Sequence, residues 1–149
     1  MPQVKFYETA EDSLLKFAVI ISDTEGKWVF CKHKERDTYE IPGGRRETGE
    51  SILETAWREL REETGYIGTV QSVIPQGYSS PGMTGETVYI AKMTVVESDQ
   101  KELKTEFDDA EDIETILVSP EDLPELIRKE HAAGNGVDIK VTAYSAAIS

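Results

Sequence analysis

One stretch of the chain, residues 44–66, constrains the fold more than any other. It reads Gly-Arg-Arg-Glu-Thr-Gly-Glu-Ser-Ile-Leu-Glu-Thr-Ala-Trp-Arg-Glu-Leu-Arg-Glu-Glu-Thr-Gly-Tyr. Ser51 and Glu54 fit a capping box at a helix start, and Gly65 fits the residue that follows a helix end. The stretch therefore predicts a glycine-containing loop that leads into a helix.

The predicted helix carries two chemically different faces. Apolar side chains at the i, i+3, i+4, i+7 spacing are expected to form a stripe that faces a core: Leu53, Ala56, Trp57 and Leu60. Three carboxylates, from Glu59, Glu62 and Glu63, are expected to project from roughly the opposite side, with Cβ atoms about 5–6 Å apart. Like charges this close repel unless a cation lies among them, and hard oxygen ligands suit Mg²⁺ or Mn²⁺. An acidic, solvated helix face is the alternative interpretation.

The residues around the carboxylates fit a metal and phosphate site. Arg58 precedes Glu62 by one helical turn, so its guanidinium is expected to orient a carboxylate. Gly43 and Gly44 have no Cβ, which lets the backbone approach a phosphate or a metal ion closely. The loop and the helix together therefore predict a site at which a cation meets phosphate oxygens.

This pattern resembles the Nudix box, which reads Gly, five residues, Glu, seven residues, Arg-Glu-aliphatic-any-Glu-Glu-any-Gly-aliphatic. The chain matches every invariant position from Gly44 to Gly65, and Tyr66 stands at the last position, which is usually aliphatic. The resemblance implies an α/β fold, the Nudix-type α/β/α sandwich around a mixed β-sheet. It also implies Mg²⁺- or Mn²⁺-dependent hydrolysis of the pyrophosphate bond in a nucleoside diphosphate linked to another moiety.

The resemblance also implies which residues hold the metal. Glu59, Glu62 and Glu63 would be ligands, together with the main-chain carbonyl of Gly43, and the site would bind more than one ion. Glu50 would add a weaker metal contact. These ligands are all oxygen atoms, as Mg²⁺ and Mn²⁺ prefer.

The resemblance implies catalytic roles for the same segment. Arg58 would orient Glu59, and Glu62 would be a ligand or a base. Gly44 is a candidate substrate-binding residue. Water would attack one phosphorus of the diphosphate while bound metal ions stabilise the leaving phosphate.

A segment beyond the box carries the signal for the substrate. ADP-ribose pyrophosphatases of this family have a proline beyond the box, usually in Ser-Pro-Gly and followed by an acidic residue. Here Ser80-Pro81-Gly82 precedes Glu86. The resemblance therefore implies substrate contact by Pro81 and a role for Glu86 as catalytic base or additional metal ligand. An ordinary turn at Pro81 is the alternative.

Other functions stay open from the sequence. One is the removal of damaged or excess nucleoside triphosphates, and another is nucleotide sensing by a module that does not hydrolyse its ligand. Arg36 and Tyr39 are substrate-binding candidates for an enzyme that acts on ADP-ribose or on nucleoside triphosphates. Arg36 would reach phosphate and Tyr39 would stack on a base, with a solvated loop end as the alternative. The base could also come from a later acidic run: Asp108, Asp109 or Glu111.

Composition sets the broad class of protein. The chain has 149 residues and a formal charge of −13, which argues against a nucleic-acid polymer as partner, because affinity for the phosphate backbone comes from clustered Lys and Arg. We expect one domain over residues 1–149 that binds a small-molecule nucleotide. A single cysteine, Cys31, and the lack of an apolar run that could span a bilayer predict a cytoplasmic protein with no membrane contact. The resemblance leaves a homodimer open.

Local patterns predict the order of the remaining elements. Strands are expected at residues 17–22, 27–32, 38–41, 66–76, 86–97 and 113–118. A helix is expected to start at Ser119-Pro120 and to end near residue 130, and a last helix is expected from about Asp138. The first two strands enclose a tight turn, so we expect a hairpin there.

Overall fold

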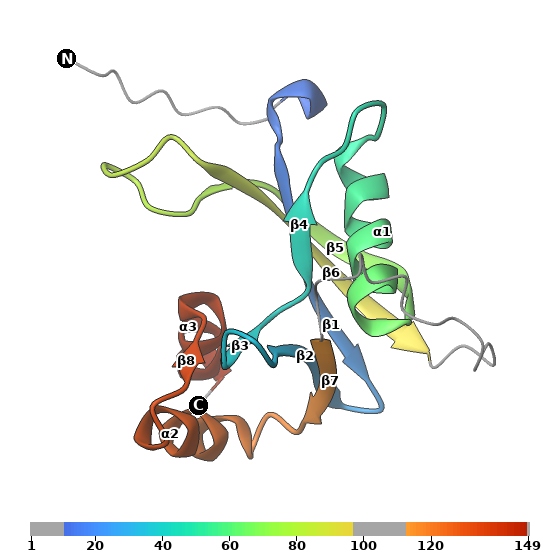
Figure 1. Ribbon diagram of the computed structural model, residues 1–149. Coiled ribbons are helices and arrows are strands. Elements are labelled where there is room, and N and C mark those ends of the chain that lie inside the picture. The colour runs from blue at the N-terminus through green and yellow to red at the C-terminus, as the bar shows by residue number, and fades with distance from the viewer. Residues whose placement is uncertain (1–10, 97–112, 149) are drawn as a thin grey trace.

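The structure is a computed structural model that describes residues 11–96 and 113–148 (Figure 1). Its elements follow the chain in this order: η1 (Asp12–Leu14), β1 (Phe17–Thr24), β2 (Lys27–His33), β3 (Thr38–Glu40), β4 (Gly43–Arg45), α1 (Ile52–Thr64), β5 (Ile67–Tyr78), β6 (Thr87–Val96), β7 (Ile113–Val118), α2 (Leu123–Ala132), β8 (Gly136–Val137) and α3 (Ile139–Ile148). Strands and helices are interspersed along the chain, as in α/β folds.

The strands form one mixed sheet in the order β5-β6-β1-β2-β3-β8, with β4 also paired to β1 and β7 to β2. β1 is parallel to β6 and β3 is parallel to β8, whereas the other pairs are antiparallel. Phe17 of β1 pairs with Arg45 of β4 on one side and with Val88 of β6 on the other. β1 therefore connects the glycine-rich loop to the β5–β6 hairpin.

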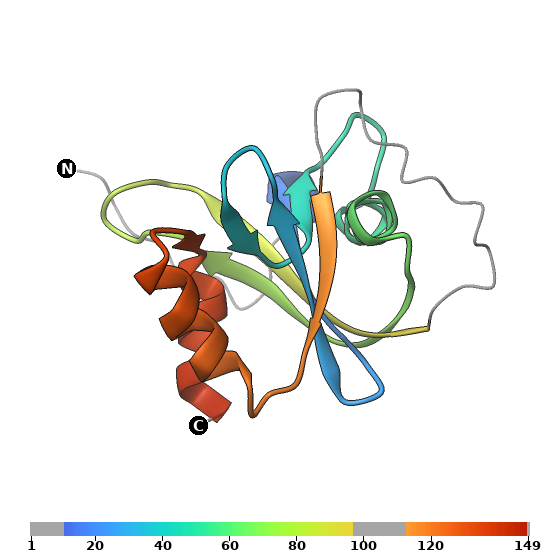
Figure 2. The same cartoon turned by 60° about the horizontal axis from the view of Figure 1, so that its bottom comes forward.

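Helices cover both faces of the sheet. α1 lies on one face, and α2 and α3 lie on the other (Figure 2). The α1 side holds a core that includes Ile20, Leu60 and Met93, and the other side holds a core that includes Phe30 and Leu123. This arrangement confirms the expected α/β sandwich around a mixed sheet. None of the helices in the described ranges has the length and apolar character that a membrane crossing requires.

Most predicted elements lie where the local patterns place them. β1 and β2 form the expected hairpin, and β7 spans the predicted residues. The sequence did not indicate β4, because Gly-Gly-Arg has no β-branched or aromatic residue, and it did not indicate β8, because two residues are too short for a periodic signal. The helix expected from Ser119 begins at Leu123 instead, because residues 119–122 form a turn in which Ser119 Oγ donates to Asp122 Oδ2 at 2.6 Å.

The buried face of α1 differs from the predicted stripe. Its buried residues are Ile52, Thr55, Ala56 and Leu60. Leu53 packs at the edge of the core, but Trp57 is 43% exposed, so its assignment to the stripe is wrong. The reason is that α1 also packs along β4, which turns the buried face toward the carboxylates. Glu59 consequently lies at the border of the buried face, with its side chain 12% exposed, and not on the opposite side.

Alanine substitutions at Leu60 and Trp57 test the observed orientation of α1. Leu60→Ala removes a fully buried side chain, so the free energy of unfolding should fall by about 2–5 kcal/mol. Trp57→Ala removes a half-solvated ring and should cost about 1 kcal/mol or less. Urea unfolding measures both values. Equal losses would place Trp57 in the core and contradict the observed packing.

Candidate active site

Reciprocal hydrogen bonds fix the start of α1. Ser51 Oγ accepts from Glu54 N at 3.2 Å, and Glu54 Oε2 accepts from Ser51 N at 2.7 Å, which together form the predicted capping box. At the other end, Gly65 adopts a left-handed conformation with φ of 74°, and its N–H donates to the carbonyl of Arg61 at 2.8 Å. The ends of the helix that carries the carboxylates are therefore set by local contacts.

Asp12 of η1 contacts both α1 and the loop before it. Its Oδ1 accepts from Ile52 N at 2.9 Å, and its Oδ2 forms an ion pair with Arg46 Nη1 at 2.8 Å. Arg46 also donates to the main-chain carbonyl of Asp12. Because the amide of Ile52 has no acceptor within the helix, Asp12 satisfies a group that the helix leaves unpaired.

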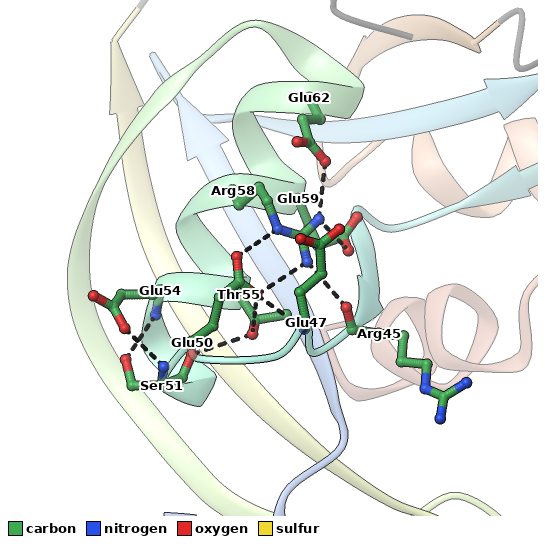
Figure 3. Close-up of polar contacts among 9 residues, drawn as sticks. All are labelled: Arg45, Glu47, Glu50, Ser51, Glu54, Thr55, Arg58, Glu59 and Glu62. Carbon is green, nitrogen blue, oxygen red and sulfur yellow. Dashed lines mark hydrogen bonds and ion pairs between the residues drawn. The ribbon is translucent and has the colours of Figure 1, made fainter. Parts of the chain in front are cut away.

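The guanidinium of Arg58 lies among the carboxylates (Figure 3). Its Nε donates to Glu50 Oε1 at 2.7 Å, and its Nη1 donates to Glu59 Oε1 at 2.8 Å and to Glu62 Oε2 at 2.9 Å. Its Nη2 donates to the carbonyl of Arg45 at 2.9 Å, while the Arg45 side chain points away from the cluster. Arg58 therefore joins the loop to two turns of α1, and the expected contact with Glu62 is present.

Glu50 anchors Arg58. Its Oε2 accepts from Glu47 N at 3.1 Å, from Thr55 Oγ1 at 2.9 Å and from Arg58 Nη2 at 3.2 Å. The hydrogen bonds from Arg58 are the largest cause that lowers the pKa of Glu50 from 4.5 to about 2, whereas burial acts in the opposite direction. A metal contact by Glu50 would have to displace one of these donors.

Glu59 is more buried than Glu50 or Glu62. It lies against Gly44, where an added Cβ would be 2.2 Å from Glu59 Oε1. Burial raises the pKa of Glu59, and the neighbouring Arg58 lowers it in part. Residue 44 must therefore be glycine for the Glu59 carboxylate to keep this position.

Glu63, near the end of α1, lies beside Cys31 of β2. The Cys31 side chain is fully buried, and burial raises the pKa of its thiol well above the usual range. The neighbouring carboxylate of Glu63, to which the thiol is hydrogen-bonded, raises this pKa further. Cys31 is therefore a packing residue whose thiol stays protonated.

The oxygen donors of the cluster fit a divalent cation by their chemistry. Among the described residues no three His, Cys, Asp or Glu side chains surround a common point, because Glu59 and Glu62 converge on Arg58. Both carboxylates nevertheless reach the same guanidinium nitrogen, and Glu59 is largely desolvated beside the Gly43–Gly44 backbone. Hard oxygen donors of this kind suit Mg²⁺ or Mn²⁺, provided that the carboxylates rotate away from Arg58.

The predicted substrate contacts before the box lie in the turn between β2 and β3 and in the middle of β3. Arg36 is exposed, and its Nη2 lies 2.8 Å from Nε2 of the buried His33 ring. Tyr39 is 7% exposed, and Lys32 Nζ lies over its ring, 5.2 Å from the centroid. Little of the Tyr39 ring is therefore free to stack on a base, whereas Arg36 is accessible to a phosphate.

The loop between β5 and β6 carries Pro81 and Glu86, both exposed. Figures 1 and 2 show the tip of this hairpin well away from α1, so the structure does not bring Pro81 next to the carboxylates. Glu86 lies at the foot of the loop. Val88, two residues after Glu86, pairs with Phe17 of β1, and Phe17 pairs on its other side with Arg45 of β4. Two strand spacings, or about 10 Å, therefore separate the main chain at Val88 from that at Arg45. The other candidate bases lie outside the described residues: Asp108, Asp109 and Glu111.

Sequence reasoning missed two groups that hold the cluster together. Thr55 donates its hydroxyl hydrogen bond to Glu50, and Arg45 contributes its main-chain carbonyl to Arg58. A threonine between Ile52 and Ala56, on the buried side of a helix, indicates a hydroxyl that needs a hydrogen-bond partner. The carbonyl leaves no signal, because every residue has one.

Comparison with known proteins identifies the family. The model of the NUDIX domain matches residues 13–137. This chain belongs to the Nudix family. The ADP-ribose pyrophosphatase of Bacillus subtilis (strain 168) is 39% identical over 117 residues, which cover 74% of this Nudix protein and 60% of the relative. The ADP-sugar pyrophosphatase of Mus musculus is 35% identical over 115 residues, which cover 73% and 51%.

Structural comparison supports the same fold for this Nudix protein. A crystal structure of a hydrolase of the NUDIX family from Clostridium perfringens superposes with a TM-score of 0.58 at 16% identity, covering 89% of this chain and 93% of that chain. At this identity the likeness concerns the fold alone. The chain spans about half to three fifths of the length of the two curated relatives.

Replacing Glu50 with Gln tests the anchor of Arg58 in this Nudix protein. Because the folded-state pKa of Glu50 is about 2, below the ordinary 4.5, its ionised form stabilises the fold fully above pH 4.5 and loses this effect as the pH falls toward 2. Glu50→Gln should lower the free energy of unfolding at pH 7 by about 1–3 kcal/mol, and the difference from the wild type should shrink over that range. Denaturant titrations at several pH values check this. A difference that does not depend on pH would refute the role of the charge.

Proposed function

We propose that this Nudix protein hydrolyses the pyrophosphate bond of ADP-ribose or of a related nucleoside diphosphate sugar. One observation carries the proposal: the buried carboxylate of Glu59 lies against Gly44, while Arg58 joins it to Glu50 and Glu62. A carboxylate cluster fixed beside a glycine backbone suits cations that bind a diphosphate. The names of the Bacillus subtilis and mouse relatives support the substrate class.

In this proposal Glu59, Glu62 and Glu63 hold the divalent cations together with the carbonyl of Gly43. Bound cations would neutralise phosphate oxygens and activate the attacking water. Glu62 is the most exposed carboxylate joined to Arg58, so its free oxygen is accessible to a bound cation. Glu86 is the base in this proposal. Arg58 fixes the relative positions of the Glu59 and Glu62 carboxylates through charge-assisted hydrogen bonds.

A nucleoside triphosphate is the alternative substrate, because the cluster acts on a phosphate chain and not on a particular nucleotide. The exposed guanidinium of Arg36 is accessible to phosphate in either case. A nucleotide sensor without hydrolysis is the alternative from another class of protein. The complete set of box carboxylates on α1 favours the enzyme over the sensor.

A substrate panel with Glu59→Gln tests the activity. With Mg²⁺ or Mn²⁺, ADP-ribose should yield AMP and ribose 5-phosphate faster than dinucleoside polyphosphates or normal and oxidised nucleoside triphosphates are cut. Glu59→Gln should reduce turnover by about 100-fold or more with the fold intact, because it removes a ligand charge. Glu125→Gln, at an exposed glutamate of α2, is the control and should leave turnover unchanged.

Each other result of the panel has a defined meaning. Faster cleavage of nucleoside triphosphates than of ADP-ribose would identify a triphosphate pyrophosphatase. Binding of nucleotide without any cleavage would identify a sensor. Near-normal turnover of Glu59→Gln at saturating Mg²⁺ would remove Glu59 from the proposed ligands.

A second pair of substitutions tests the base. Glu86→Gln should lower the turnover number by about 10-fold to 100-fold, because a general base contributes rate enhancements of this order or larger, while Asp108→Asn should have a mild effect. Steady-state rates between pH 5 and 9 check both variants against the wild type. The reverse ranking would move the base to the later acidic run.

A further inference from the structure

Within residues 11–96 and 113–148, the exposed guanidinium of Arg45 in β4 forms no ion pair and no hydrogen bond. The next residue, Arg46, pairs with Asp12, and Arg58 of α1 pairs with three glutamates. The whole chain has 29 acidic side chains against 16 Lys and Arg, so carboxylate partners are abundant. An arginine that faces none of them is available to an anion that comes from outside the chain.

The direction of the Arg45 side chain follows from its place in β4. An added Cβ at Gly44 would lie 2.2 Å from Glu59 Oε1, so position 44 faces α1. Successive residues of a strand point to opposite faces, and Figure 3 shows the Arg45 side chain directed away from the carboxylates. Arg45 pairs with Phe17, which pairs with Val88, so its side chain leaves β4 on the face that these two residues share.

One edge of β4 is turned toward the carboxylate cluster. The other edge pairs with β1, where Arg46 N donates to the carbonyl of Lys16 at 2.8 Å. Main-chain groups alternate between the two edges of a strand, so those of Gly43 and Arg45 point away from β1. The carbonyl of Arg45 accepts from Arg58 Nη2 at 2.9 Å, which places this edge beside the cluster.

This edge presents an acceptor and a donor next to each other. The carbonyl of Gly43 is the proposed ligand of a cation, and the N–H of Arg45 is the next main-chain group on the same edge. Neither group has a hydrogen-bond partner in the part of the chain that the structure describes. A phosphate that binds a cation at the Gly43 carbonyl would therefore meet a main-chain donor and, from the same residue, a free guanidinium.

We propose that Arg45 is a substrate-binding residue that holds the diphosphate. Its N–H donates to a phosphate oxygen at the free edge of β4, and its guanidinium binds the same diphosphate from the side away from the carboxylates. The planar fork of arginine suits phosphate oxygens, and hydrogen bonds between charged groups are stronger than neutral ones. This inference rests on the proposed function, and it applies to any substrate that contains a diphosphate.

Calorimetric titration with inorganic diphosphate in the presence of Mg²⁺ tests the contact. Arg45→Ala should weaken binding by about tenfold or more, because it removes a charge-assisted hydrogen bond, whereas Arg45→Lys, which keeps the charge without the fork, should fall between it and the wild type. The matched control is Arg128→Ala on α2, where the side chain is 70% exposed. It removes the same charge from the chain and should leave binding unchanged.

Two further measurements separate binding from a structural role. Arg45→Ala keeps the main-chain carbonyl that Arg58 contacts, so its urea unfolding midpoint should equal that of the wild type. With ADP-ribose its KM should rise by about tenfold or more, with a smaller change in kcat.

The outcomes distinguish this inference from the proposed function. A wild type that binds diphosphate through Arg45 but does not cleave ADP-ribose would refute the proposed function and leave the inference standing. Arg45→Ala that binds diphosphate as tightly as Arg128→Ala, or a wild type that does not bind diphosphate with Mg²⁺, would overturn the inference.

Discussion

The candidate site depends on the hydrogen bonds between Arg58 and three glutamates. Three glutamates lie within hydrogen-bond distance of one guanidinium, in a chain whose net charge is already −13. Without this cation the carboxylates of Glu59 and Glu62 would repel each other on adjacent turns of α1. A lysine has one ammonium in place of the planar fork, and it cannot reach Glu50, Glu62 and a main-chain carbonyl at once. The cluster thus uses the geometry of arginine as well as its charge.

Local spacing made part of this site predictable from the sequence. The capping box, the helix stop at Gly65 and the contact between Arg58 and Glu62 all join residues within one or two turns, so a sequence pattern contains them. The burial of Glu59 and the exposure of Trp57 depend on where β4 lies against α1. The Gly-Gly-Arg sequence of β4 has no residue that favours a strand, so the orientation of the helix required the structure.

The residues assigned to chemistry and those assigned to substrate choice lie on different elements. The carboxylates and Arg58 are on α1, whereas Pro81 and Glu86 are in the loop at the end of the β5–β6 hairpin. A substrate in contact with both would have to extend across β1, which lies between the start of β6 and β4.

Asp12 shows that a family match and a structural unit need not share a boundary. The NUDIX domain model begins at residue 13, immediately after the aspartate that satisfies the Ile52 amide and pairs with Arg46. A shortened protein that started at the matched boundary would keep every residue of the box. It would nevertheless lose the hydrogen bond between the first turn of α1 and the segment upstream of β1. The first turn of the helix that carries the carboxylates is therefore held in part by an acidic side chain that no motif contains.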